Sequence, residues 1–150
     1  MSIAADQHFL YRGTSIDWQG GSTLNRLRLT CTSSDPLVAT LFGIECLRHG
    51  EGVVQIAPRL PLNGLIGPSN VLSSLEREIT LRLLPAEFEN YVVQTISAAQ
   101  ARDILNNMGY ELPERIGGYF QLGRWIEDTA SRRLSELELA DFNSQALNLP

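Results

Sequence analysis

The amino-acid sequence predicts one α+β domain, and two observations support this prediction. Segments with the pattern of short strands dominate up to Ile96, whereas helical patterns dominate after it. This separation argues against a regular alternation of strands and helices. The chain has 150 residues and 43% hydrophobic content, which is the size of one ordinary domain that can bury its own core. A single domain over residues 1–150 is therefore expected.

The first elements are two short strands and a helix. Apolar and alternating patterns predict strands at 9–12, stopped by Gly13, and at 27–32. A helix is predicted over 36–48, because its apolar residues fall on one helical stripe. Asp35 suits the N-cap of this helix, and a proline occupies the first helical position.

The middle of the chain predicts more strands, about six in all. Residues 53–57 form a short apolar strand, and 61–74 form a loop rich in glycine and proline. From Glu76 the polarity alternates, so Glu76 and Glu78 are expected on one face of a strand. Residues 91–96 predict a further strand.

The last third is predicted to be helical. Ser97 and Gln100 form a capping box before a helix that Gly109 can terminate. Further helices are expected within 116–134 and 136–146, the second starting from a Ser-x-x-Glu box. These helices carry no chemical motif and are interpreted as packing elements.

Composition excludes several classes of function. The net charge is −5, with 12 basic and 17 acidic residues and no basic patch, which argues against a broad nucleic-acid surface. No segment is apolar enough to span a membrane, and Met1 to His8 lack the pattern of a signal peptide, so a soluble protein is expected. Cys31 and Cys46 have no metal-ligand neighbourhood and form no disulfide framework, so no metal site is expected.

Three short motifs carry the chemistry. Arg12 lies in Phe-Leu-Tyr-Arg-Gly-Thr-Ser, Thr32 lies in a Thr-Cys-Thr-Ser-Ser cluster that leads into a helix, and Glu76 and Glu78 form a Glu-x-Glu pair that opens a strand. Taken singly, these motifs are typical of a turn, a helix cap and a solvated strand face. Their order resembles the ADP-ribosyltransferase superfamily over about residues 9–96.

The resemblance implies a fold and an activity. The fold would be the ADP-ribosyltransferase-like split of two small β-sheets with flanking helices, with NAD in the cleft between the sheets and residues 97–150 as a helical packing segment. The activity would be an NAD-dependent mono-ADP-ribosyltransferase that modifies a macromolecular acceptor, most simply a protein. Such an enzyme could be cytoplasmic, or a bacterial effector or toxin delivered by a route that needs no classical signal peptide.

The resemblance also implies roles for the acidic and basic residues. Glu78, the second glutamate of the pair, would be catalytic, and Glu76 would assist the acceptor. A carboxylate beside the ribose stabilises the positive charge that develops when the bond to nicotinamide breaks. Arg12 would bind the NAD diphosphate, since a guanidinium holds phosphate oxygens in a bidentate fashion.

The remaining roles fall on small residues. Thr32, Ser33 and Ser34 would shape the cleft and orient the catalytic glutamate. Gly13 and Thr14 would let the backbone approach the nicotinamide amide, and the loop from Gly64 to Ser74 would contact the acceptor.

The branch of the superfamily stays open. Only 17 residues separate Arg12 from Thr30, fewer than in the bacterial toxin branch. Tyr-Arg-Gly-Thr-Ser also looks like the His-Gly-Thr/Ser turn of the poly-ADP-ribose polymerase branch, with arginine replacing histidine. Two other functions stay open as well, a noncatalytic nucleotide-binding or protein-binding domain of the same fold and an NAD glycohydrolase.

Overall fold

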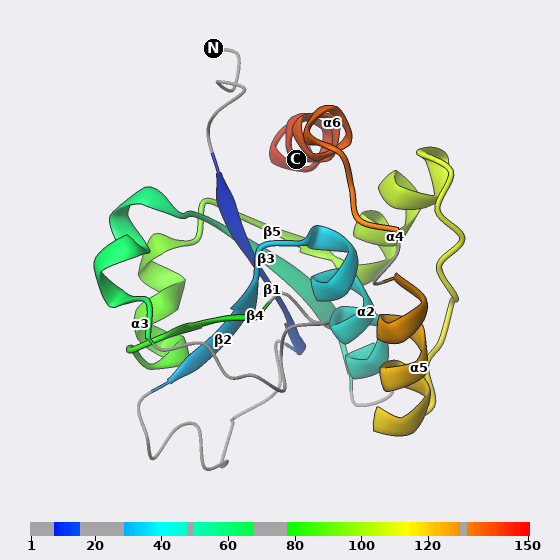
Figure 1. Cartoon of the computed structure of the whole chain (residues 1–150), viewed down its shortest axis with the longest axis horizontal. Helices are drawn as coiled ribbons and strands as arrows, with labels where there is room; N and C mark the ends of the chain where they lie inside the picture. Colours follow the sequence, from blue (N-terminus) through cyan, green and yellow to red (C-terminus); the bar gives the residue numbers. More distant parts are fainter. Residues whose placement is uncertain (1–7, 16–28, 48–49, 68–77, 130–131) are drawn as a thin grey trace.

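The computed structural model describes residues 8–15, 29–47, 50–67, 78–129 and 132–150. Within these ranges the fold is mixed α/β and is built on one antiparallel sheet with strand order β4-β2-β1-β3-β5 (Figure 1). The strands are β1 (Phe9–Ser15), β2 (Thr30–Ser33), β3 (Gly52–Pro58), β4 (Glu78–Leu81) and β5 (Gln94–Ser97).

Helices follow most of these strands. The α-helices are α2 (Pro36–Cys46), α3 (Pro85–Phe88), α4 (Ala98–Asn107), α5 (Tyr119–Thr129) and α6 (Glu136–Leu147), and the 3₁₀ helices are η2 (Leu60–Leu65) and η4 (Glu89–Tyr91). In the described part of the chain, none of the helices combines the length and the apolar character needed to cross a lipid bilayer.

The central strand β1 is buried on both faces. Tyr11 belongs to the larger core, together with residues of α2, α4, α5 and α6, whereas Leu10 belongs to a smaller core with Leu62 of η2 and Phe88 of α3. Successive residues of a strand point to opposite faces, so the two cores lie on the two sides of the sheet. Figure 1 accordingly shows α3 on the side of the strands away from α2.

The helix predicted after the second strand is confirmed as α2. Asp35 is its N-cap and accepts a hydrogen bond from the backbone N–H of Leu37 at 2.9 Å. Most residues of α2 are buried, rather than a single stripe, because α2 packs between the sheet and the helices α4 and α5 (Figure 1). The interior position of α2 therefore explains why its sequence is apolar on nearly every side.

The expectation that Gly13 stops the first strand is wrong, since β1 runs on to Ser15. Gly13 instead allows α2 to lie directly against β1. A Cβ atom at Gly13 would stand 1.9 Å from the carbonyl oxygen of Ala39 and 2.6 Å from the backbone nitrogen of Gly43. The absence of a side chain at this position is thus a packing requirement.

Other predicted bounds are shifted. The 3₁₀ helix η2 overlaps the start of the loop expected at 61–74. The strand expected at 91–96 is confirmed as β5 over its second half, and η4 ends where that strand was expected to begin. The strand with the Glu-x-Glu pair is described from Glu78 onward, while Glu76 lies outside the described residues. The two C-terminal capping boxes are confirmed, with Ser97 and Ser135 each accepting from the N3 backbone N–H.

The expected split into two small sheets is not confirmed. All five described strands belong to one sheet, because β1 pairs with β2 along one edge and with β3 along the other. The pairing between β1 and β3 covers seven residue pairs, from Phe9 with Pro58 to Ser15 with Gly52. Among the described residues, the pairing between β1 and β2, by contrast, is a single residue pair, Tyr11 with Ser33.

Candidate functional site

The three motifs lie on three neighbouring strands. β1 carries Arg12, β2 carries the hydroxyl cluster and β4 begins at Glu78, and these strands lie side by side in the order β4-β2-β1 (Figure 1). The register aligns Ser33 with both Tyr11 and Glu78. Segments far apart in the sequence thus meet across three strands. Successive strand residues alternate between faces, so Arg12 and Thr32 occupy register positions on one face of the sheet, and Ser33 and Glu78 occupy positions on the other.

Arg12 lies half-buried on the central strand, on the face opposite to Tyr11. Its Nη1 donates a hydrogen bond to Oε1 of Gln55, the cross-strand partner on β3, at 3.3 Å. Burial lowers the pKa of the Arg12 guanidinium, and the nearby Cys31, Cys46 and Glu89 act in the opposite direction. A partly desolvated guanidinium interacts more strongly with an anion than one in bulk water.

The hydroxyl cluster ties β2 to β4 and starts α2. Thr32 Oγ1 donates to the carbonyl oxygen of Ile79 at 2.7 Å, and Thr30 Oγ1 donates to the carbonyl oxygen of Leu83 at 2.8 Å. Ser33 Oγ accepts from the backbone N–H of Asp35 at 3.1 Å. Because Ile79 directly follows Glu78, the bond from Thr32 fixes the backbone beside the predicted catalytic residue.

The two small residues after Arg12, Gly13 and Thr14, are packed inside the protein. Gly13 faces the backbone of α2, and Thr14 is buried with 8% of its surface exposed. Ser34, by contrast, lines a pocket whose described lining contains none of residues 12–14. The structure therefore brings Thr32 and Ser33 close to the strand of Glu78, and Ser34 lines a pocket to which Ile79 of the same strand contributes.

The sequence did not single out two groups of residues. Gln55 is the one polar residue in the apolar run Val-Val-Gln-Ile-Ala. A single polar residue in a buried strand indicates a hydrogen-bond partner, which here is Arg12. Arg59 and Arg133, which line the pocket with Ser34, are far apart in sequence and belong to no motif. Only the folded chain brings these two arginines together.

No group of three or more histidine, cysteine, aspartate or glutamate residues that could hold a metal ion occurs among the described residues. Comparisons with protein-family models, with curated proteins and with solved structures found no match.

Proposed function

We propose that this protein is an NAD-dependent mono-ADP-ribosyltransferase that transfers ADP-ribose to a macromolecular acceptor, most simply a protein. The observation that carries the proposal is the strand order β4-β2-β1, which places Glu78, Thr32 and Arg12 on adjacent strands. Along the chain, 19 residues separate Arg12 from Thr32 and 45 residues separate Thr32 from Glu78, so their adjacency is a property of the fold. Because Arg12 and Glu78 occupy opposite faces in this register, NAD in this proposal passes around the edge strand β4 to reach both residues.

The reaction breaks the bond between the ribose C1′ atom and the nicotinamide nitrogen. The bonding electron pair leaves with nicotinamide, and positive charge develops on the ribose ring. Glu78 stabilises this charge as a carboxylate, and the acceptor nucleophile then bonds to C1′ while its proton passes to Glu76. Atoms and charge balance without a metal or a second cofactor.

The remaining residues position these groups. Arg12 holds the diphosphate, and its hydrogen bond to Gln55 orients the guanidinium on the rigid central strand. Thr32 fixes the β4 backbone through its bond to Ile79, and Ser33 is in register with Glu78. The role proposed for the loop from Gly64 to Ser74 is acceptor recognition, and residues 68–74 of that loop lie outside the described residues.

The decisive experiment follows nicotinamide release from NAD with and without cell lysate. Transfer predicts release that depends on lysate, together with labelled lysate protein. Glu78→Gln should lower this release about a hundredfold or more, since it removes a principal electrostatic stabiliser. Glu127→Gln is the matched control, because Glu127 is an exposed glutamate on α5 far from the motif strands in sequence.

The other outcomes separate the alternatives. Equal release with and without lysate would identify an NAD glycohydrolase, which uses the same residues with water as acceptor. No release under either condition would contradict the enzyme proposal and favour a noncatalytic binding domain. Equal turnover in the Glu78→Gln and Glu127→Gln variants would remove Glu78 from the catalytic role.

A further inference from the structure

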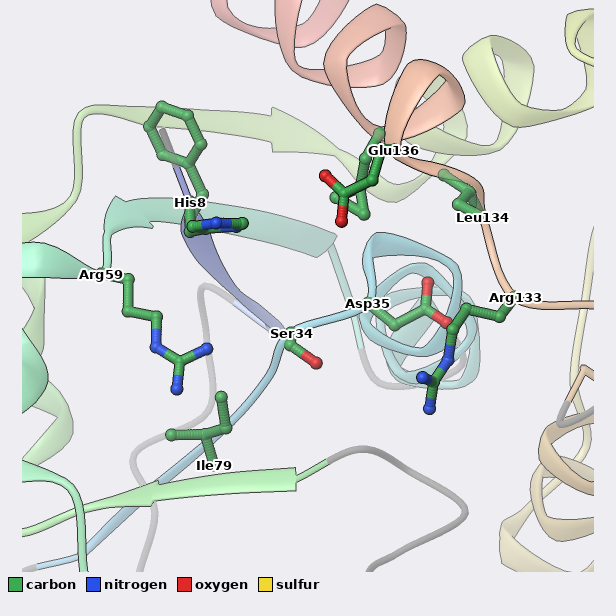
Figure 2. A pocket seen from close by; sticks show the side chains of 10 residues that line it. His8, Ser34, Asp35, Arg59, Ile79, Arg133, Leu134 and Glu136 are labelled. Carbon is green, nitrogen blue, oxygen red and sulfur yellow. The ribbon is translucent and has the colours of Figure 1, made fainter. Parts of the chain in front are cut away.

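A pocket of about 410 Å³ lies beside the start of β1, the junction of β2 with α2, and the start of α6. Its polar lining includes His8, Ser34, Arg59, Arg133 and Glu136, which come from separate segments of the chain (Figure 2). Arg12 does not belong to the described lining. The pocket is therefore distinct from the position proposed for the NAD diphosphate.

One side of the pocket offers donors for an anion. The guanidinium groups of Arg59 and Arg133 lie on opposite sides of the Ser34 hydroxyl (Figure 2). Among the described residues, neither Arg133 nor Ser34 has a hydrogen-bond or ion-pair partner for its side chain, and Arg59 makes one bond, from Nε to Asn63 Oδ1 at 3.4 Å. Two guanidinium groups and a hydroxyl suit the oxygens of a phosphate group.

Two helices, α2 and α6, start at the pocket, and their N-termini also favour an anion. Asp35 is the N-cap of the 11-residue α2, and Glu136 is the first residue of the 12-residue α6. Helix N-termini carry partial positive charge. The Asp35 carboxylate already accepts from the N–H of Leu37, so it is directed at its own helix.

The opposite side of the pocket carries a hydrogen-bond acceptor, which suits a ligand with donor groups. The exposed Glu136 carboxylate lies across the pocket from Arg59 and Arg133 (Figure 2). A carboxylate accepts hydrogen bonds from hydroxyl groups. A bare anion would leave Glu136 unpaired, whereas a sugar phosphate presents phosphate oxygens at one end and hydroxyl donors at the other.

An apolar wall completes the pocket. Phe9 and Leu134 line it and are 5% and 4% exposed, and Leu139 of α6 lies beside them. This wall can cover one face of a planar base. The volume is near the lower end of the range of roughly 300–1,000 Å³ for small-molecule sites, which favours a single nucleotide over a dinucleotide.

From these observations we infer that the pocket binds a nucleoside monophosphate. The phosphate lies between Arg59 and Arg133 and accepts from Ser34, the ribose hydroxyls donate to Glu136, and the base packs against Phe9 and Leu139. This site is independent of ADP-ribosyl transfer, so its test needs no turnover of NAD.

The test is calorimetric titration of the whole chain with AMP, adenosine and inorganic phosphate. AMP should bind more tightly than either fragment, because only AMP uses both sides of the pocket. Arg133→Gln and Arg59→Gln should each weaken AMP binding about tenfold or more, the scale of a lost charge-assisted hydrogen bond. Arg124→Gln is the matched control, an exposed arginine of α5 outside the lining, and should bind AMP as the unmodified protein does.

Four results would overturn the inference. These are no binding of AMP at millimolar concentration, equal affinity for adenosine and AMP, unchanged AMP affinity in both arginine variants, and loss of AMP binding in Arg12→Lys with retention in Arg133→Gln. The last result would place AMP at the proposed NAD site. Arg133 is exposed, and circular dichroism would verify that its variant is folded.

Discussion

Gly13→Ala tests whether the glycine after Arg12 serves packing or ligand binding. The added Cβ would stand 1.9 Å from the Ala39 carbonyl oxygen, which is 1.1 Å short of even a 3.0 Å contact. Its next neighbours are Gly43 N at 2.6 Å and Phe42 Cβ at 2.8 Å. The obstacle is mainly the backbone of a buried helix, so no side-chain rotation relieves it, and α2 must move away from β1.

The expected cost can be estimated from the contacts. Overpacking a core costs about 1–3 kcal/mol when side chains can adjust, and a clash with helix backbone belongs at the upper end, about 3 kcal/mol. For a chain of this size, 1 kcal/mol lowers Tm by roughly 2–4 °C, so Gly13→Ala should lower Tm by roughly 6–12 °C. The control is Gly123→Ala, because a Cβ at this exposed position of α5 meets nothing within 4 Å.

Thermal unfolding followed by circular dichroism, with NAD affinity measured in parallel, decides between the two roles. A Gly13→Ala variant with unchanged Tm and lost NAD binding would refute the packing argument and support the predicted contact with nicotinamide. A large fall in Tm, with Gly123→Ala unchanged or slightly more stable, would establish packing as the reason for glycine at this position.

Three further predictions concern Arg12 and the tyrosines. Arg12→Lys should weaken NAD binding in calorimetry although the charge is kept, because the planar fork is lost, and unchanged affinity would assign Arg12 a structural role. Tyr11→Phe should lower the free energy of unfolding by about 1–3 kcal/mol, because it leaves the buried Asn143 Oδ1 without the Tyr11 hydroxyl, and urea unfolding measures this loss. Burial raises the pKa of Tyr11, and burial followed by the hydrogen bond to Glu138 raises the pKa of Tyr110 to about 12. The pKa of tyrosine in an unfolded chain is about 10, so the unfolded chain releases these protons at a lower pH than the folded protein. The free energy of unfolding should therefore fall as the pH rises above about 10. Urea unfolding midpoints that stay constant above this pH would contradict the prediction.

Local signals in the sequence were sufficient to predict where three of the helices begin. Asp35, Ser97 and Ser135 begin α2, α4 and α6 as predicted, because a cap depends on residues within one turn. The continuation of β1 through Gly13 could not be predicted, because its cause is α2, which approaches from a later part of the chain. A glycine in the sequence gives no indication of which backbone lies against it.

For the candidate site, too, the sequence identified single motifs but not their arrangement in space. The sequence singled out Arg12 and the hydroxyl cluster, and the strand order brings them together with Glu78, which no periodicity could establish. The pocket lined by Arg59 and Arg133 was not predicted, because two arginines that meet from distant segments leave no local pattern in the sequence.

The bond between Tyr11 and Asn143 also bears on the order of events during synthesis. It joins residues 132 positions apart, so a ribosome makes the central strand well before its partner on α6. Until Asn143 has emerged, the Tyr11 side of the sheet lacks α6, and Phe142 cannot make its edge-to-face contact with the Tyr11 ring. The larger core should therefore stay incomplete in a nascent chain until residues 142 and 143 have emerged.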